Sequence, residues 1–266
     1  AMQIVRFGLD GETILDGPRV FRNVVESGRY RTPRSTAWSV QVDRELTRRV
    51  LLRFGYEERR SRRDFLLEPQ TSPTGESALV LSNRGRSRYR EFQIVARLRL
   101  QEQHDLFLAY VRSRAEGDLN SFSTYIGNFR NPVVRPNEYS RLPFDAPNRL
   151  LLWGDLRLPF DLLLSPVVDW RDGFPFSLVD EEQNFVGPRN RGGRFPRFFS
   201  LDLQITKGVT IPFFGKKYRT RLGVKIFNVT NHWNPRDVQS NTHSPAFGTF
   251  YNSVPRTFRG KFEIEF

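Results

Sequence analysis

Apolar and polar residues alternate over several long stretches of the chain. Over residues 92–100 every second residue is apolar, and most of the residues between them are polar or charged. Residues 199–206 and 258–266 repeat this alternation. A period of two is typical of a β-strand with one apolar and one polar face, and a helical period is hard to find anywhere. The pattern therefore predicts an all-β protein.

Ten strands are predicted, and the connections between them differ in length. The predicted strands cover residues 2–9, 36–46, 49–60, 88–100, 105–113, 148–158, 162–171, 197–207, 218–229 and 256–266. Short connections alternate with long ones rich in Gly, Pro, Asn and Arg, which lie at 10–35, 61–87, 114–147, 172–196 and 230–255. This alternation is typical of an up-and-down antiparallel meander with one plain end and one elaborate end.

Composition narrows the environment in which such strands are stable. Only 38% of the 266 residues are hydrophobic, and no apolar run approaches the roughly 20 residues of a membrane helix. Strands of about ten residues match the length that crosses a bilayer at a tilt of about 45°. Several polar faces carry full charges, which suits a water-lined or ion-paired lumen better than a soluble β-sandwich. We therefore expect residues 1–266 to form one transmembrane antiparallel up-and-down β-barrel of about ten strands, with short periplasmic turns and long extracellular loops.

The strand count gives the expected orientation. The last predicted strand runs inward and ends at the periplasm, and ten strands return residue 1 to the same side. We expect a Gram-negative outer-membrane protein with both termini in the periplasm. The chain has no Cys, which excludes disulfides, thiol nucleophiles and thiolate metal ligands, and no cofactor is expected.

Five segments carry a resemblance to a known family. One is Phe-Asn-Val-Thr-Asn-His-Trp-Asn-Pro at 227–235, and the others are 110–120, 127–132, 170–176 and 195–203. Together they resemble the C-terminal barrel half of TonB-dependent receptor-like outer-membrane proteins of acidobacterial type. The resemblance extends over residues 90–266 and implies an outer-membrane barrel with a role in substrate uptake.

The chain departs from that family in what it contains. Such receptors have about 22 strands around a plugged lumen, and they carry a TonB box. We expect no plug domain and no TonB box in this chain. The expected function is therefore that of a passive pore or membrane scaffold, with transport only if a plug and further strands are present elsewhere.

Charged residues alternate with the apolar ones and are expected to face the lumen. The candidate site residues are Arg53, Arg97, Arg99, Asp155, Arg157, Asp202, Arg221, Lys225, Arg259, Lys261, Glu263 and Glu265. Arg forks that bind carboxylates hold neighbouring strands in register, whereas rings of like charge would make a pore that favours anions. A narrow barrel leaves little free space, which favours the ion-paired filling.

Aromatic and apolar residues supply two further expectations. Phe262, Ile264 and Phe266 form a C-terminal signal of the type that outer-membrane barrels present to their insertion machinery. Four aromatic residues near predicted strand ends are candidates for interfacial girdles, with core packing an equally ordinary role: Trp38, Tyr110, Trp153 and Trp170.

Catalytic and metal sites are weakly indicated. The alternative function is a surface protease of the omptin kind, for which His232 and His243 lie near Asp237 in one predicted outer loop. No omptin-like sequence surrounds them, and His104 falls in a periplasmic turn, so no enzyme is expected. The acidic run 180–182 lacks the spaced ligands of a calcium loop, so no metal site is expected.

The charge of +13 is concentrated in arginines of the predicted loops. Two clusters stand out: Arg59, Arg60, Arg62, Arg63, Arg84, Arg86 and Arg88, and then Arg189, Arg191, Arg194 and Arg197. On a barrel these residues would meet lipopolysaccharide phosphates, which makes outer-membrane lipid the expected partner. A soluble nucleic-acid-binding protein is the third alternative, but the polar strand faces carry no aromatic ladder for bases. The oligomeric state is left open.

Overall fold

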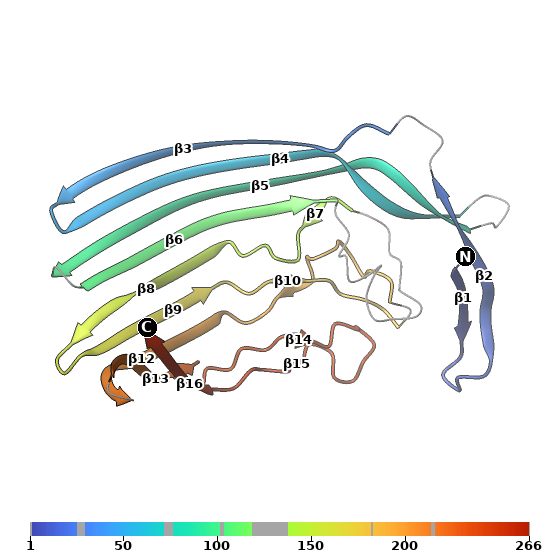
Figure 1. Ribbon diagram of the computed structural model, residues 1–266. Helices are drawn as coiled ribbons and strands as arrows, with labels where there is room; N and C mark the ends of the chain where they lie inside the picture. The colour runs from blue at the N-terminus through green and yellow to red at the C-terminus, as the bar shows by residue number, and fades with distance from the viewer. Residues whose placement is uncertain are drawn as a thin grey trace.

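Successive strands of the computed structural model lie side by side in one curved sheet (Figure 1). The structure describes residues 2–25, 30–71, 77–101, 104–118, 138–181, 183–213 and 216–265. Among these residues nine strands form the meander: β3 (Arg34–Thr47), β4 (Val50–Thr71), β5 (Ser77–Gln101), β6 (His104–Gly117), β8 (Asn148–Leu158), β9 (Leu162–Arg171), β12 (Phe198–Phe213), β13 (Lys216–Phe227) and β16 (Thr257–Glu265).

Each strand of the meander pairs with the next in antiparallel fashion. Short turns such as those between β3 and β4 and between β8 and β9 gather at one end, and the long connections gather at the other (Figure 1). The predicted fold class, an antiparallel up-and-down all-β protein of about ten strands, is confirmed. None of the described residues belongs to a helix that is long and apolar enough to cross a membrane.

Two strands are longer than the alternation predicts. The strands β4 and β5 have 22 and 25 residues and take in most of 61–87, which was predicted to be a loop. Their paired ends contain many arginines and serines, including the pairs Arg60↔Arg88 and Ser61↔Ser87. Strand pairing depends on backbone hydrogen bonds, so a hairpin that projects into water continues after the apolar alternation has ended.

A short hairpin precedes the meander in the sequence. The strands β1 (Met2–Phe7) and β2 (Ile14–Val25) pair with each other, and β2 runs parallel to the loop-side end of β5. The hairpin lies at the long-loop end, away from the C-terminal end of β16 (Figure 1). Met2 at the start of β1 and Glu265 at the end of β16 therefore lie at opposite ends of the sheet, and the side of a membrane on which each terminus lies stays a prediction.

The short hairpin of β1 and β2 follows from local features of the sequence. With 6 residues, β1 is shorter than the 9–11 residues needed to cross a bilayer. The Asp10 carboxylate accepts hydrogen bonds from the N–H groups of Glu12 and Thr13 at 3.1 and 3.0 Å, so the chain turns back at once into β2.

The sheet has two open edges among the described residues. There β3 pairs with β4 alone and β16 pairs with β13 alone, so the curved sheet does not close on itself. Both β3 and β16 run from the long-loop end toward the short-turn end, because an even number of reversals separates them.

Shorter strands lie in the connections at the long-loop end. The pair β10 (Pro175–Phe176) and β11 (Gly193–Arg194) and the pair β14 (Asp237–Val238) and β15 (Phe250–Tyr251) form two small ladders. The strand β7 (Ser140–Arg141) pairs antiparallel with the loop-side end of β6. Arg194 on β11 ties two connections together, since its guanidinium donates to the backbone oxygens of Asp145 and Gly173 at 2.6 and 3.0 Å.

The two faces of the sheet differ, because directly paired residues of neighbouring strands point to the same side. We call one side the apolar face; it is defined by the row Val42, Phe54, Ile94, Tyr110, Leu150, Trp170 and Phe199. The other is the charged face, defined by the next row: Asp43, Arg53, Val95, Ala109, Leu151, Asp169 and Ser200.

Little of the apolar surface is buried. Among the described residues only five hydrophobic side chains are buried: Leu66, Val80, Ala115, Leu142 and Val179. On the apolar face Val42 is 57% exposed, and Phe258 and Phe262 are 63% and 60% exposed. A soluble domain of this size buries most of its apolar surface, so this sheet lacks the core that would hold it together in water.

Candidate functional site

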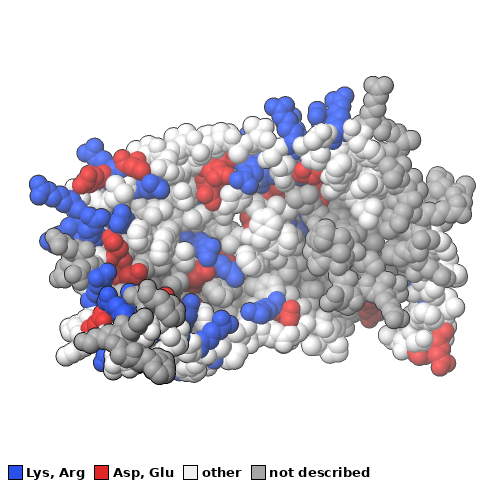
Figure 2. All heavy atoms as spheres, viewed as in Figure 1, with Lys and Arg blue, Asp and Glu red and all other residues white. Residues whose placement is uncertain are grey.

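The register places the predicted lumen charges together on the charged face. Ladder positions put all twelve residues on that side: Arg53, Arg97, Arg99, Asp155, Arg157, Asp202, Arg221, Lys225, Arg259, Lys261, Glu263 and Glu265. They come from strands as far apart as β4 and β16. The side of the sheet that faces a lumen remains a prediction, but the alternation does select one common face. Figure 2 shows positive and negative side chains intermingled over the surface in view.

Several of these charges form ion pairs. The Arg53 guanidinium donates to both carboxylate oxygens of Asp43, at 2.9 and 3.0 Å. Arg97 lies 3.3 Å and Arg99 lies 3.8 Å from the Asp105 carboxylate. These contacts join adjacent strands and have the geometry expected of an ion-paired filling.

The strands later in the chain add one more ion pair and two hydrogen-bonded carboxylates to the same face. The Lys261 ammonium is 2.9 Å from Glu263. Asp155 accepts a hydrogen bond from Ser165 Oγ at 2.5 Å. Asp202 accepts one from Ser200 Oγ at 2.6 Å and one from the backbone N–H of Asn228 at 2.9 Å.

Some of the cations on the charged face have no carboxylate partner among the described residues. The Lys225 ammonium and the Arg259 guanidinium lie over the Phe227 ring, at 4.6 and 5.1 Å from its centroid. Arg157 has only its backbone N–H engaged, as a donor to His104 Nδ1 at 3.0 Å. The charged face therefore combines neutralised pairs with free positive charge.

The predicted girdle residues divide between the two faces. Trp38, Tyr110 and Trp170 lie on the apolar face, as a girdle requires. Trp153 lies on the charged face and stacks on Phe107 with their ring centroids 5.3 Å apart. The position of Trp153 near a strand end does not reveal its side of the sheet, because the alternation of β8 is irregular.

The charged face ends in an aromatic cavity of about 450 Å³ near the long loops. The Arg171 guanidinium lies between the Phe174 and Phe198 rings, 4.0 and 4.5 Å from their centroids. Its N–H groups have no hydrogen-bond acceptor among the described residues. Arg236 and Asn234 also line the cavity. Sequence reasoning did not select Arg171, because the residues around it come from connections with no regular period.

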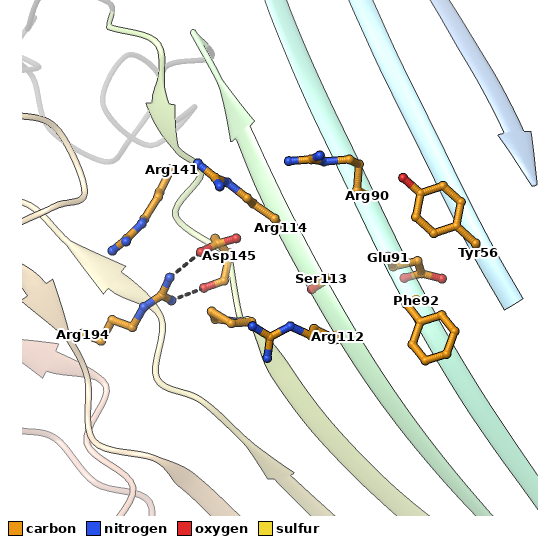
Figure 3. A pocket seen from close by; sticks show the side chains of 11 residues that line it. Tyr56, Arg90, Glu91, Phe92, Arg112, Ser113, Arg114, Arg141, Asp145 and Arg194 are labelled. Carbon is orange, nitrogen blue, oxygen red and sulfur yellow. Dashed lines mark hydrogen bonds and ion pairs between the residues drawn. The ribbon is translucent and has the colours of Figure 1, made fainter. Parts of the chain in front are cut away.

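A second cavity, of about 410 Å³, opens on the apolar face beside the connection from β7 to β8 (Figure 3). Four arginines on its rim extend from three neighbouring elements: Arg90, Arg112, Arg114 and Arg141. The Asp145 carboxylate closes one side, held by Arg194 at 2.5 Å and by the Ala115 N–H at 2.7 Å.

The predicted loop clusters are only partly loops. Most arginines of the first cluster lie on the extended ends of β4 and β5. There the Glu58 carboxylate forms ion pairs with Arg60 and Arg88 at 2.5 and 2.8 Å. In the second, Arg189 is buried, and its guanidinium donates to the Gly117 and Glu138 backbone oxygens. Arg189 therefore links its own connection to the end of β6 and to Glu138, and it is not exposed to an external partner.

The histidines do not form a catalytic pair among the described residues. The Asp237 carboxylate accepts a hydrogen bond from Asn252 Nδ2, and no imidazole contacts it. The His232 ring instead packs edge-on against Phe199, with centroids 5.7 Å apart. Asp180 holds Asn184, and Glu182 of the acidic run lies outside the described residues. No group of three or more potential metal ligands occurs within the described ranges.

The C-terminal residues lie on the free edge of the sheet. Phe262 and Ile264 project from β16 on the apolar face and are 60% and 39% exposed. Phe266 lies outside the described residues. The exposure of the first two leaves them accessible for contact along the unpaired edge, as an insertion signal requires.

Comparison with known proteins identifies the fold. No protein-family model and no curated protein sequence matches the chain. Among solved structures, the outer membrane transporter YddB from Escherichia coli is similar with a TM-score of 0.62 and 13% identity, over 92% of this chain and 34% of that one. The FrpB iron transporter from Neisseria meningitidis is similar with a TM-score of 0.52 and 12% identity, over 91% and 32%.

The chain thus spans about a third of the length of the transporters it matches. At these identities the likeness concerns the fold. The protein has the fold of a section of an outer-membrane transporter β-barrel.

Proposed function

We propose that this chain forms part of the wall of an outer-membrane β-barrel and acts as a passive pore or membrane scaffold. Uptake of a substrate would require a plug and further strands, as in the TonB-dependent receptors that the sequence resembles. The charged face lines the lumen in this proposal, and the apolar face contacts lipid.

The observation that carries the proposal is the contrast between the two faces of one continuous sheet. Rows of exposed apolar residues cover one face, while all twelve candidate charges lie on the other. Such a sheet is unstable in water, because its apolar face has nothing to pack against. In a bilayer the same face is in its preferred environment, and the ion pairs lie in a polar lumen.

The open edges constrain how the barrel closes. In lipid every backbone N–H and C=O needs a partner, so the edges of β3 and β16 must pair. These two strands run in the same direction, and joining them directly would give a parallel pair. An antiparallel closure therefore requires an odd number of additional strands between β3 and β16. One additional strand is the smallest number that meets this condition, and a section of a larger wall with more strands meets it as well.

Two measurements on the full chain test the proposal. A closed barrel in detergent migrates faster on a gel when unheated than when boiled, and an unchanged migration would contradict closure. Conductance steps across a planar bilayer support the pore, with anions favoured by the free cations at Arg157, Lys225 and Arg259. A barrel that inserts without conducting supports the scaffold.

The alternative functions lack a supporting observation. The protease has no contact between histidine and Asp237 among the described residues. The nucleic-acid-binding protein requires stability in water, which the exposed apolar face opposes. A chain that stays dispersed in water without detergent would support the nucleic-acid-binding protein and contradict the membrane proposal.

A further inference from the structure

We propose that the apolar face carries a binding site for the phosphate groups of a membrane-anchored lipid of the lipid A type. The site consists of Arg90, Arg112, Arg114 and Arg141. The inference rests on the proposed function, since it takes the apolar face to contact the bilayer and the long loops to lie outside the cell.

The position of these arginines follows from the strand register. One row of the apolar face contains Val40, Tyr56, Phe92 and Arg112, in that order across β3 to β6. Every row between it and the short turns is mainly apolar. Arg90 and Arg114 pair directly in the next row toward the loops, and Arg141 lies one row further, opposite Glu116.

The face therefore changes from apolar through aromatic to basic within three rows. Alternate residues on a strand are about 7 Å apart, so the change takes place over roughly 15 Å. Aromatic residues mark the interface of a membrane-spanning barrel with the headgroup region. Guanidinium groups just beyond that boundary lie at the depth of lipid phosphates.

The charges around the cavity are not balanced. Arg194 is neutralised by Asp145, and Arg114 by Glu116 at 2.6 Å. Arg112 donates to the neutral amide oxygen of Asn148 at 3.1 Å.

Among the described residues, no hydrogen bond or ion pair holds the guanidinium of Arg90 or Arg141. Glu91 also lines the cavity, and its carboxylate accepts a hydrogen bond from the Tyr89 hydroxyl, which lies on the charged face. The site thus presents about three uncompensated positive charges, two of them with all of their donors free.

The shape of the site fits a phosphorylated amphiphile. Figure 3 shows Arg90, Arg112, Arg114 and Arg141 extending around a common space, with Tyr56 and Phe92 beside it. The cavity of about 410 Å³ is large enough for a phosphorylated sugar. Arg forks bind phosphate oxygens in bidentate fashion, and the aromatic rings below supply apolar contact for the start of an acyl chain.

The location favours a lipid over a soluble anion. The site opens on the face that contacts the membrane in the proposed function, whereas a transported anion would pass along the charged face. The cations of the charged face at Arg53 and Arg97 are also neutralised by Asp43 and Asp105. Free cations remain on the charged face at Arg157, Lys225 and Arg259, so a variant that removes two of them tests whether phosphate binds on that face instead.

The test compares two double variants of the full chain in detergent micelles. Arg90→Gln with Arg141→Gln removes the two free guanidinium groups of the site. Arg157→Gln with Arg259→Gln removes the same charge from the opposite face and serves as the matched control. The probes are lipid A with two phosphates, lipid A from which both phosphates have been removed, and inorganic phosphate, each titrated against the protein by fluorescence.

The parent is expected to bind the phosphorylated lipid A at least about tenfold more tightly than the dephosphorylated form. The site variant is expected to lose about tenfold or more, since each charge-assisted hydrogen bond contributes about that much to affinity. The control variant is expected to stay within about twofold of the parent. Equal binding by the two double variants would overturn the site, and equal binding of the two lipids would overturn phosphate recognition.

Two further outcomes are distinguishable. Inorganic phosphate that binds as tightly as lipid A would overturn the lipid as ligand. If the site variant does not fold, the comparison of the two lipids on the parent still decides the proposal. Heat-modifiable migration of the parent distinguishes a failure of the lipid site from a failure of the proposed function. A closed barrel without phosphate preference contradicts the lipid site and leaves the proposed function intact.

Discussion

Two adjacent leucines on β8 offer a direct comparison of the two faces. Leu152 lies on the apolar face between Leu108 and Val168, and Leu151 lies on the charged face between Ala109 and Asp169. Both side chains have intermediate exposure. Leu152→Arg and Leu151→Arg therefore make the same chemical change, one residue apart, toward opposite sides of the sheet.

The expected costs differ by the environment that receives the charge. An arginine on the lipid face of a barrel costs about 2–4 kcal/mol at the bilayer midplane. The Leu152 row is flanked by apolar rows on both sides, so this range applies to Leu152→Arg. In the proposed barrel, an arginine at position 151 would face the lumen, near the Asp169 carboxylate that Arg149 already binds, so its cost is about 1 kcal/mol or less, mainly for the lost leucine contacts.

Equilibrium unfolding in guanidinium chloride from lipid vesicles measures this difference. The four tryptophans of the chain report the transition by fluorescence. We expect Leu152→Arg to shift the unfolding free energy by at least about 1 kcal/mol more than Leu151→Arg does. Costs within about 0.5 kcal/mol of each other, or a larger cost at position 151, would refute the assignment of the two faces.

Two further predictions concern the backbone and the pH dependence. A Cβ at Gly173 would lie 1.7 Å from the Phe195 carbonyl oxygen, whereas a Cβ at Gly260 would meet nothing within 4 Å. Gly173→Ala should therefore lower the unfolding free energy by about 1–3 kcal/mol and Gly260→Ala should leave it nearly unchanged, and similar midpoints in guanidinium would be the opposing result. Burial raises the pKa of Asp118 above its ordinary value of 3.8, so the stability from its protonated form is fully present below pH 3.8 and is lost as the pH rises through the raised pKa. Between pH 4 and pH 7 the parent should lose more stability than Asp118→Asn, and an equal or smaller loss would show that the pKa is not raised.

The sequence predicts the central strands of the meander well. The predicted strands at 148–158 and 162–171 coincide with β8 and β9. The last three strands differ from the predictions by one or two residues at each end, except that β12 continues six residues further, to Phe213. Period-two alternation is imposed wherever one face meets lipid or an apolar layer and the other meets water, so it is strongest in these segments. The same alternation placed the candidate charges on one side of the sheet.

The rest of the fold lacks that constraint. The outer ends of β4 and β5 have polar residues on both faces, so nothing in their sequence distinguishes a projecting hairpin from a loop. The strand β2 was not predicted, because it pairs with β1 and β5 at the loop end and needs no continuous apolar face. Alternation alone does not distinguish the 6 residues of β1 from a spanning strand, because it carries no information on where pairing ends.

The cavity arginines were not predicted for a related reason. Arg90, Arg112 and Arg114 are spread over two strands and alternate with other polar residues, and Arg141 comes from a connection with no regular period. Only the register shows that they meet on one face, one to three rows beyond the last apolar row. A sequence signal does exist in the change from apolar to basic at every second position of 86–98, but the partner strands are needed to turn it into a site.

Spin labels on β5 would show directly whether one face of the sheet contacts lipid and the other water. The chain has no Cys, so a single cysteine can be introduced in turn at each position from 92 to 99 and labelled in the membrane-inserted protein. We expect high accessibility to oxygen at even positions and high accessibility to a water-soluble nickel complex at odd positions, because successive side chains point to opposite faces. Accessibilities that rise and fall together, or that show no period of two, would contradict this expectation.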